Sequence, residues 1–526
     1  MSSVRQTETN DVSEILSTHY DYDFEFNTKE NEYITDNYMN LKRRRALAEI
    51  DNAEFSWFHI RACIVSGVGF YTDAYDLFAI NLVSSMLGFV YFKPSGYVPQ
   101  NIDIGLKISA ACGTLFGQLI FGWFADRYGR KKMYGLELSI MIFATIGSAL
   151  SADAFAVSIW GELMFWRFIL GIGIGGDYPL SAGAMMAAVF AMQGFGILTA
   201  AIVSLVTLAI YQDHISKDPS YIDHVWRLVL GFGVIPAVIA LYFRLKVPET
   251  PRFTMDVERN VHQAAYDIKT VHPKRRKHNK RKNHNSLSKP VLVTDAPRAT
   301  WKNFKEYFGQ WKNAKILIGT SVSWFVLDVA FYGIGLNNSI ILKAIRFADH
   351  DDDPYKTLWN MSVGNIIVTM LGTVPGYWFT VFLVDKWGRK FIQLLGFGIL
   401  TILFTILGFF YHQILDTSLP LFIIIFTSCQ FFLNFGPNAT TFIIPGEVFP
   451  TRYRSTGHGI SAASGKLGAI IAQVGFIQLK DNGGPNQFVN QNMVNNDNID
   501  VDDCGESGSN YVHIRKYKNN RNYLWA

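Results

Sequence analysis

The strongest indication of the fold is the stretch Gly122-Trp-Phe-Ala-Asp126-Arg127-Tyr-Gly129-Arg130-Lys131. It follows a long apolar run, and a shorter version, Asp385-Lys386-Trp-Gly388-Arg389-Lys390, follows another. The matching aspartates of the two motifs, Asp126 and Asp385, are 259 positions apart (385 − 126). Two acids inside apolar runs, Asp73 and Asp328, are 255 positions apart (328 − 73). The nearly equal offsets predict two halves that are related by duplication.

The composition is that of a membrane protein. Of 526 residues, 49% are hydrophobic and only 17% are charged, against roughly 25% in soluble domains. The first 56 residues are polar and acidic, so we expect no signal peptide and a start in the cytosol. The four cysteines have no paired spacing, so neither disulfides nor a zinc site is predicted. We expect no metal and no cofactor.

Eleven apolar stretches are long enough to cross a bilayer as helices, which takes about 20 residues each. They lie near residues 58–92, 103–125, 133–151, 155–180, 183–211, 226–246, 314–346, 358–384, 391–413, 418–445 and 456–479.

Basic residues fix the expected orientation of these spans. They cluster at residues 42–45, 127–132 and 386–390, whereas residues 349–353 are acidic. Because cytosolic loops carry the excess of lysine and arginine, the basic clusters are expected inside and the acidic loop outside. A further basic run at 272–282 is interpreted as a solvated cytosolic loop. The expected surroundings are a lipid bilayer, with no nucleic acid partner.

The predicted fold is an all-α membrane protein with two pseudo-symmetric six-helix halves. After Lys480 the chain becomes rich in Asn, Asp and Gly, so the twelfth helix is expected to be missing. The predicted segments are a cytosolic N-terminal tail (1–56), an N-terminal transmembrane half (57–248), a cytosolic central loop (249–312), a C-terminal transmembrane half with five spans (313–480) and a polar C-terminal tail (481–526).

Two motifs in the first half of the chain resemble those of the major facilitator superfamily. The stretch at 122–131 resembles the superfamily's signature loop, and Pro248-Glu-Thr-Pro-Arg252 is similar to its Pro-Glu-Ser-Pro-Arg. Such transporters consist of inverted repeats and bind substrate between their halves near mid-membrane. No nucleophile–base pair is visible, so we do not expect an enzyme.

Four longer strings resemble the fungal and plant phosphate:proton symporters, with the fungal high-affinity members most similar. They are Gly67-Val-Gly-Phe-Tyr-Thr-Asp-Ala-Tyr-Asp-Leu-Phe78, Gly175-Gly-Asp-Tyr-Pro-Leu-Ser181, Phe435-Gly-Pro-Asn-Ala-Thr-Thr-Phe442 and Gly446-Glu-Val-Phe-Pro-Thr-Arg-Tyr-Arg-Ser-Thr-Gly457. The resemblance implies proton-coupled symport of inorganic phosphate (H2PO4⁻) into the cell by alternating access, in a multi-pass protein of the plasma membrane.

The resemblance also implies roles for individual residues. Those matching the family's phosphate contacts are Tyr178, Gln193, Trp324, Asp328, Tyr332 and Asn438. Those matching its proton-coupling positions are Asp73, Asp76, Glu137, Asp177, Asp328 and Lys466. The loop motifs are expected to latch helices on the cytosolic side, with gating residues Asp126, Arg127, Arg130, Asp385, Arg389, Glu447 and Arg452.

The residues themselves suggest how coupling could work. Trp324, Asp328 and Tyr332 are four residues apart and therefore share one helical face. An ionised acid inside a bilayer costs at least about 2.5–3.5 kcal/mol, so such acids mark functional sites. A carboxylate at 328 accepts a hydrogen bond only from a protonated oxyanion, which would favour phosphate over sulfate. Anion binding nearby would favour uptake of a proton. The alternative for these acids is simple pairing with Arg167 or Lys466.

One departure from the family leaves its function open. Ser181 is followed directly by Ala182-Gly-Ala-Met185, where relatives have about fifteen more residues. Because a helical hairpin usually needs a connection of about 2–8 residues, either the fourth span ends just beyond Tyr178 or Gln193 is displaced. This omission and the missing twelfth helix make a phosphate receptor or pseudo-transporter that does not transport one alternative. A glycerophosphodiester or sugar carrier on the same fold is the other.

Overall fold

The glycine turn within each of the two repeated motifs has the same backbone geometry. In the computed structural model, α4 (Gln100–Tyr128) ends at Gly129, with φ 94° and ψ 150°, and α17 (Val374–Trp387) ends at Gly388, with φ 85° and ψ 149°. Glycine adopts positive φ at little cost because it lacks Cβ. The next helix begins at once, α5 (Arg130–Leu150) after the first turn and α18 (Arg389–Phe409) after the second. The sequence repeat is therefore also a structural repeat.

The structure describes residues 57–93, 96–180, 186–245, 299–345, 347–348 and 353–481, all within one compact unit. Several predictions fall outside these residues: the tail 1–56, the Pro248–Arg252 motif with most of the central loop, the connection 181–185, the acidic residues 349–352 and the tail beyond Asp481.

Every regular element in the described ranges is a helix. The first half contains α3 (Trp57–Tyr91), α4, α5, α6 (Ile159–Leu180), α7 (Met186–Ile210), α8 (Gln212–Lys217), η1 (Pro219–Tyr221), α9 (Ile222–Gly231) and α10 (Val234–Arg244). The second contains α13 (Trp301–Phe308), α14 (Trp311–Gly335), α15 (Asn338–Ala344), α16 (Pro354–Val368), η3 (Thr369–Thr373), α17, α18, α19 (Tyr411–Thr417), α20 (Leu419–Leu433), η4 (Asn434–Asn438), α21 (Ala439–Val448), η5 (Thr451–Tyr453) and α22 (Arg454–Asp481).

Each of the eleven predicted spans overlaps one of these helices or a set of joined helices. Within the described residues, eight helical segments are long and apolar enough to cross a membrane. Large apolar side chains point outward, among them Phe143 (70% exposed), Phe382 (67%) and Ile402 (61%), while charged side chains such as Arg167 and Glu137 are buried. Soluble proteins show the opposite distribution of apolar and charged side chains, so this one suits a protein surrounded by lipid. The prediction of an all-α membrane protein is confirmed.

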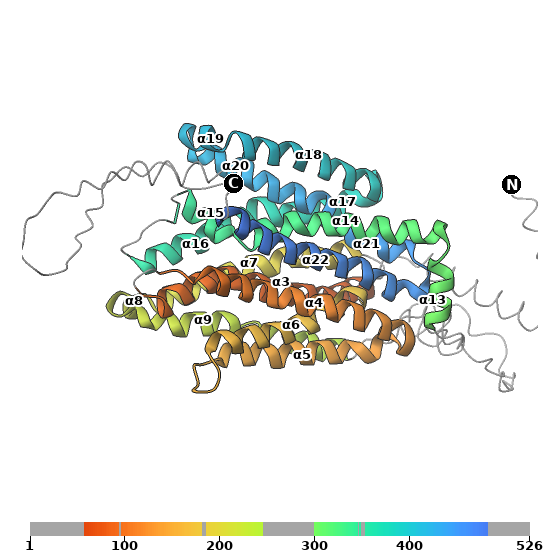
Figure 1. The fold of residues 1–526 in the computed structure, drawn as a ribbon, viewed down its shortest axis with the longest axis horizontal. Coiled ribbons are helices and arrows are strands. Elements are labelled where there is room, and N and C mark those ends of the chain that lie inside the picture. Colours follow the sequence, from red (N-terminus) through yellow and green to blue (C-terminus); the bar gives the residue numbers. More distant parts are fainter. Residues whose placement is uncertain are drawn as a thin grey trace, which may run out of the picture. The chain divides into compact units, whose positions relative to one another are not determined.

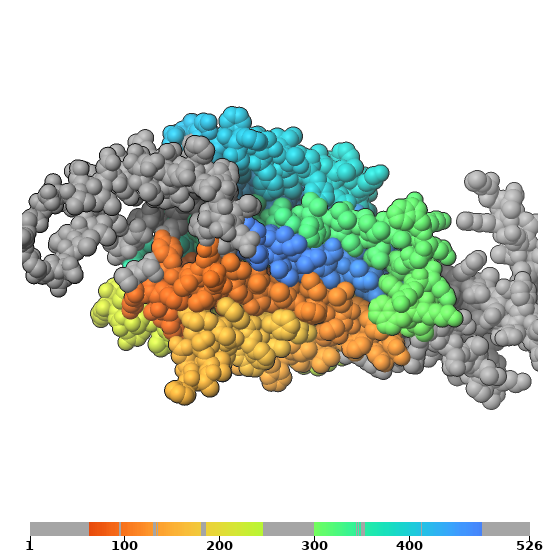
Figure 2. Space-filling model, in the orientation of Figure 1, coloured from red at the N-terminus to blue at the C-terminus, as the bar shows by residue number. Residues whose placement is uncertain are grey.

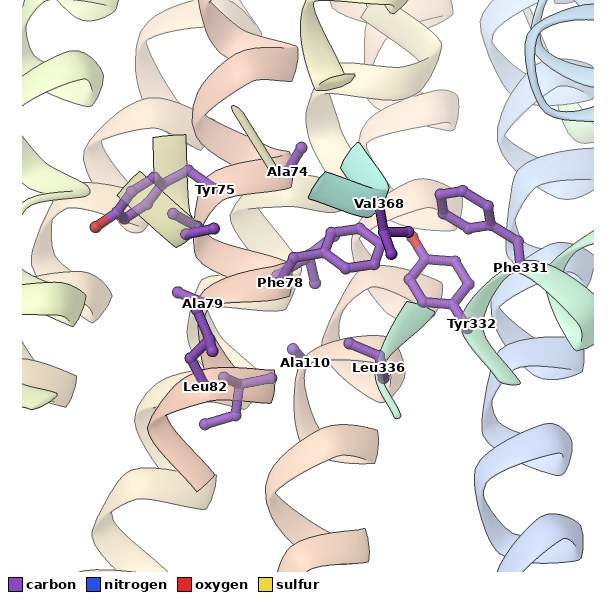
Figure 3. Packing of buried hydrophobic residues seen from close by; sticks show 14 of the residues in the cluster. Ala74, Tyr75, Phe78, Ala79, Leu82, Ala110, Phe331, Tyr332, Leu336 and Val368 are labelled. Atoms are coloured by element: carbon purple, nitrogen blue, oxygen red, sulfur yellow. The ribbon is translucent and has the colours of Figure 1, made fainter. Parts of the chain in front are cut away.

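The helices lie side by side, and the largest contacts between the halves involve α22 and α7. α22 packs between α14 of its own half and α4 of the other, as Figures 1 and 2 show. α7 packs on α3 and also on α16 and α17 of the second half. The apolar core continues across this boundary, because Phe78 of α3 is stacked on Tyr332 of α14 with ring centroids 6.0 Å apart (Figure 3).

Candidate functional site

One face of α14 carries three of the predicted contact residues. Trp324, Asp328 and Tyr332 are 2%, 2% and 4% exposed, and their four-residue spacing brings them to the same side of the helix. Lys466 of α22 reaches this face. Its Nζ donates one hydrogen bond of 2.8 Å to Asp328 Oδ2 and another of 2.8 Å to the phenol oxygen of Tyr332.

Gly465 allows α22 to approach α14 this closely. A Cβ at this position would stand 2.4 Å from Trp324 Cδ1 and 2.8 Å from Asp328 Oδ2. A Cβ atom essentially never lies this close to another heavy atom, so any larger residue would push the helices apart. The glycine beside Lys466 therefore sets the distance at which the lysine meets its acid.

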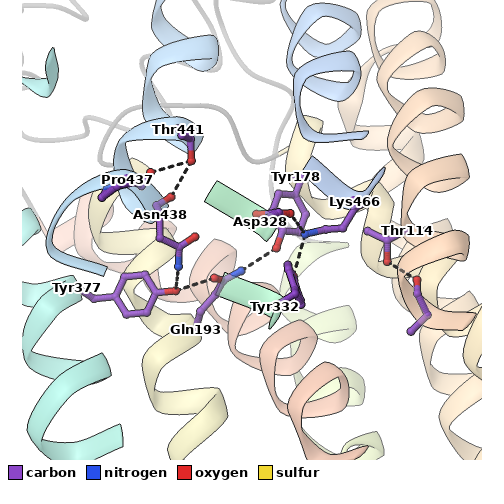
Figure 4. A network of polar contacts seen from close by, with 11 residues as sticks. Thr114, Tyr178, Gln193, Asp328, Tyr332, Tyr377, Pro437, Asn438, Thr441 and Lys466 are labelled. Atoms are coloured by element: carbon purple, nitrogen blue, oxygen red, sulfur yellow. Dashed lines mark hydrogen bonds and ion pairs between the residues drawn. The ribbon is translucent and has the colours of Figure 1, made fainter. Parts of the chain in front are cut away.

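A second chain of hydrogen bonds crosses between the halves (Figure 4). Gln193 Nε2 donates to the phenol oxygen of Tyr178 over 3.0 Å, and Gln193 Oε1 accepts from Tyr377 Oη over 3.0 Å. Asn438 Nδ2 in turn donates to Tyr377 Oη over 2.7 Å. Tyr178 and Gln193 come from α6 and α7, whereas Tyr377 and Asn438 come from the second half. The network is polar but uncharged.

A break in the tenth predicted span positions Asn438. Phe435 and Gly436 have non-helical φ and ψ within η4, between α20 and α21. Pro437 follows them, and proline lacks the N–H that would continue the helical ladder. Asn438 Nδ2 also donates to Asn434 Oδ1 over 2.8 Å, so the two amides lie at the break. The Gly-Pro kink thus directs polar side chains into the interior.

Aromatic rings surround this polar centre. Phe70 lies edge-on to Tyr178, with ring centroids 5.3 Å apart, and Phe190 stacks on Phe442 at 4.5 Å. Lys466 Nζ is 4.1 Å from the centroid of the Tyr332 ring, within the range of a cation–π contact. In such a water-poor environment, hydrogen bonds and ion pairs are stronger than in water, and unpaired polar groups are more costly.

A separate cluster of acids lies in the first half and is organised by Arg244 at the end of α10. Arg244 Nη1 is 3.0 Å from Glu137 Oε1 and 2.6 Å from Asp177 Oδ1, and Nη2 is 2.8 Å from Asp177 Oδ2. All three side chains are at most 2% exposed. The sequence interpretation considered Arg167 and Lys466 as basic partners and missed Arg244.

Asp73 and Asp76 lie on α3 beside this cluster. Asp76 Oδ2 accepts a hydrogen bond of 3.3 Å from Thr145, and Arg167 Nη1 donates to the Asp76 carbonyl oxygen over 3.5 Å. Asp73 is 0% exposed, and neither carboxyl oxygen has a hydrogen-bond partner among the described residues. A buried carboxyl without a donor is costly when ionised.

The predicted gating residues occupy different environments. Asp126 of the first half caps α22 of the second, because its Oδ2 accepts from Thr456 N (2.7 Å) and Thr456 Oγ1 (2.8 Å) and its Oδ1 accepts from Ser455 N (3.1 Å). A carboxylate there suits the positive end of a helix. Its counterpart Asp385 is 79% exposed and pairs with Arg389 at 2.8 Å within its own half.

The remaining gating residues lie near the same ends of the helices. Arg389 also forms a 2.8 Å ion pair with Glu447 of α21. Arg452 lies over the ring of Tyr453, and Arg127 over that of Tyr128. Arg130 begins α5, but its side chain is not among those that the structure describes. Asp126 thus contacts the other half through hydrogen bonds.

A model of the family described as "Sugar (and other) transporter" matches residues 62–495. The chain belongs to this transporter family. The match and the motifs agree, so the prediction of a transporter rather than an enzyme is confirmed.

Curated relatives align with most of this transporter. The "Repressible high-affinity phosphate permease" of Neurospora crassa is 46% identical over 481 residues, which cover 86% of this chain and 84% of the relative. The "Inorganic phosphate transporter PHO84" of Saccharomyces cerevisiae is 43% identical over 477 residues, covering 84% and 79%. The "Inorganic phosphate transporter 1-2" of Oryza sativa subsp. japonica is 42% identical over 469 residues, covering 82% and 86%.

Solved structures support the fold of the transporter. The proton:xylose symporter XylE bound to 6-bromo-6-deoxy-D-glucose is 18% identical with a TM-score of 0.59, covering 80% of this chain and 89% of its own. XylE from E. coli in a partially occluded inward-open conformation is 19% identical with a TM-score of 0.57, covering 81% and 94%. At this identity the likeness concerns the fold alone.

The structure brings all six predicted substrate contacts and Lys466 into the two neighbouring groups where the halves meet. Glu137 and Asp177 lie in the separate acid cluster, and Asp73 and Asp76 lie beside it. Sequence reasoning missed Tyr377, which bridges Gln193 and Asn438. In Gly376-Tyr-Trp-Phe379, nothing distinguishes this tyrosine from its aromatic neighbours. Its position depends on packing between the halves, which no local pattern reports.

Proposed function

We propose that this transporter carries inorganic phosphate into the cell together with protons, across the plasma membrane. One observation carries the proposal: where the two halves meet, a buried centre combines one carboxylate and one ammonium group with uncharged amide, phenol and indole groups. The phosphate permeases and transporters among its relatives support the same substrate.

This set of groups matches H2PO4⁻ chemically. The amides of Gln193 and Asn438 and the phenols that they contact can donate to phosphate oxygens, and Lys466 supplies positive charge. The anion's own hydroxyl groups need an acceptor, and Asp328 is one. A fixed arginine fork would hold the oxyanion bidentately; a single lysine permits release, which a carrier requires.

Competition for Lys466 would couple phosphate binding to protonation. In the structure Lys466 is bound to Asp328 at 2.8 Å. When an anion takes a share of the ammonium group, Asp328 loses part of its compensating charge and is placed beside a second negative charge. Both changes favour the protonated acid in a low dielectric. Asp328 would gain its proton from the outside and lose it to the cytosol, where renewed repulsion expels phosphate.

Contacts at both ends of the centre provide the closures that alternating access needs. At the end expected to be cytosolic, Asp126 binds the start of α22. At the opposite end, Lys107 Nζ of α4 donates to Asn337 Oδ1, just beyond α14, over 2.9 Å. Each contact joins one half to the other. We propose that these two sets break in turn as the halves rock about the centre.

Uptake of labelled phosphate by the full chain tests this proposal. The purified chain is reconstituted into vesicles, and uptake is compared with an inward proton gradient and with none. Accumulation that requires the gradient and is inhibited by unlabelled phosphate is the expected result.

Two results would contradict the proposal. Inhibition by a glycerophosphodiester or a hexose but not by phosphate would assign another cargo. Phosphate binding without accumulation would identify a receptor, provided that the Neurospora crassa permease accumulates phosphate in parallel vesicles.

A further inference from the structure

Arg244 has a role that the central site does not explain. It is buried, it lies at the last residue of α10, and it contacts acids from two other helices: Glu137 of α5 at 3.0 Å and Asp177 of α6 at 2.6 Å. It also donates to the backbone oxygen of Ser66 on α3 over 3.1 Å. One guanidinium group therefore ties three helices to the fourth that carries it.

A glycine on α3 provides the space for this contact. A Cβ at Gly69 would stand 1.9 Å from Arg244 Nη2 and 2.1 Å from Asp177 Oδ2. The arginine–aspartate pair thus lies directly on the backbone of α3. Asp73 is one helical turn further along, so it shares the Gly69 face of α3. The Arg244–Asp177 pair and Asp73 therefore lie one helical turn apart on the same face of α3.

Charge is unevenly distributed around Asp73. The charged groups that face it are Asp177 of α6, Glu137 of α5, Arg244 of α10 and Asp76 of α3 itself. α7, which also packs on α3, contains no charged residue. The charged residues of α9 are engaged elsewhere, since Asp223 binds Arg227 and Tyr91. Arg244 directly contacts Asp177 and Glu137, whereas Asp73 has no hydrogen-bond partner among the described residues.

We propose that Arg244 is a positioning residue for proton coupling: it binds the carboxyl groups of Asp177 and Glu137 beside the Gly69 face and so leaves Asp73 as the carboxyl that gains and loses the proton in this half. The inference rests on the proposed function and deepens it. The proton comes from water on the outer side, resides on a carboxyl oxygen of Asp73 and returns to water on the cytosolic side.

The test measures phosphate uptake as a function of external pH in reconstituted vesicles. Arg244→Gln removes the positive charge beside Asp177 and Glu137. These two acids should then bind protons more tightly than in the wild type and compete with Asp73 for them. We expect gradient-driven uptake to fall at least tenfold and its half-maximal external pH to rise, while phosphate–phosphate exchange without a gradient is retained. Arg244→Lys should restore much of the wild-type pH profile.

Gly69→Ala provides a second variant that changes no charge. Its Cβ would separate the pair, so we expect the same displacement of the pH profile. Two variants are the matched controls. Gly319→Ala on α14 adds a Cβ that meets nothing within 4 Å. Arg227→Gln breaks an arginine–aspartate pair away from this cluster. Both should keep the wild-type profile.

The possible outcomes separate this inference from the proposed function. A wild-type chain that moves no phosphate, or moves it independently of pH, overturns both. A pH-dependent wild type together with an unchanged profile in Arg244→Gln and Gly69→Ala overturns the inference alone. If Arg244→Gln does not fold, the pH profile of Gly69→Ala decides. If neither variant folds, the pH profile of Arg244→Lys is compared with that of Asp73→Asn. An equal displacement in these two variants overturns the inference, and a near-wild-type profile in Arg244→Lys supports it.

Discussion

Asp328 of α14 and Lys466 of α22 form a 2.8 Å ion pair in which both side chains are at most 3% exposed. Ion pairs of this kind are retained at a cost, because both charges have left water. The pair adjoins the amide and phenol network, since Lys466 Nζ lies 5.4 Å from the centroid of the Tyr178 ring and Tyr178 accepts a hydrogen bond from Gln193. A pair placed there can respond to an anion that approaches the same lysine.

The first prediction concerns this pair. Lys466→Gln leaves an uncompensated buried carboxylate, and Asp328→Asn leaves an uncompensated ammonium, so each should lower stability by about 3–5 kcal/mol. The double variant Asp328→Asn/Lys466→Gln should regain most of that loss but not gradient-driven uptake. Thermal unfolding in detergent and uptake in vesicles measure the two effects. Additive stability losses would show that the residues act independently.

The second prediction concerns Tyr377. Tyr377→Phe removes the hydroxyl that links Gln193 and Asn438. Because a lost hydrogen bond is worth about 0.5–1.5 kcal/mol, we expect the KM for phosphate to rise several-fold with little change in maximal rate. Tyr75→Phe is the control, since its hydroxyl binds the Val229 carbonyl oxygen away from the centre. An equal rise in KM in both variants would argue against a substrate contact.

The sequence predicts the helical parts of this site better than its long-range contacts. The face of α14 follows from a four-residue spacing, and the repeated turns at Gly129 and Gly388 follow from motifs. Arg244 and Tyr377 could not be found this way. An arginine at the end of an apolar run ordinarily extends to the membrane surface, yet Arg244 turns inward to acids more than 60 positions away.

The short connection after Ser181 raised two alternatives, and the structure favours one. α6 continues to Leu180, two residues beyond Tyr178, and Gln193 is within 3.0 Å of the Tyr178 phenol. Gln193 therefore lies against Tyr178 and is not displaced from it, while the connection at residues 181–185 lies outside the described residues. The sequence could not decide this, because the choice depends on how α7 packs.

The third prediction concerns gating. Asp126→Asn removes the negative charge that accepts hydrogen bonds at the start of α22. We expect the centre to open more often at the end expected to be cytosolic. A cysteine introduced between the halves at that end would then be modified faster by a thiol reagent. The matched control is Asp385→Asn, because its exposed pair with Arg389 stays within one half and such pairs contribute about 0–1 kcal/mol. Equal labelling rates in the two variants would contradict the proposal that Asp126 holds the halves together at this end.

The fourth prediction concerns the close approach of α22. Gly465→Ala places a methyl group against Trp324 and Asp328. We expect phosphate uptake to fall at least tenfold, because the Lys466 ammonium is displaced from its acid. Gly475→Ala on the same helix, where a Cβ meets nothing within 4 Å, is the control. Normal uptake in Gly465→Ala would mean that the helices tolerate a wider spacing and that the ion pair is not essential.

The last prediction concerns specificity. Phosphate at neutral pH retains hydroxyl protons, whereas sulfate has none, so before Asp328 takes up its proton the carboxylate can accept from the first anion and only repels the second. Asp328→Asn replaces that acceptor with an amide that also donates. We therefore expect sulfate, which barely inhibits phosphate exchange in the wild type, to become an effective inhibitor in Asp328→Asn. Asp328→Glu keeps the carboxylate and should keep the discrimination. Since exchange without a gradient needs no net proton transfer, this measurement isolates selection from coupling, and unchanged sulfate resistance in Asp328→Asn would place the selective group elsewhere.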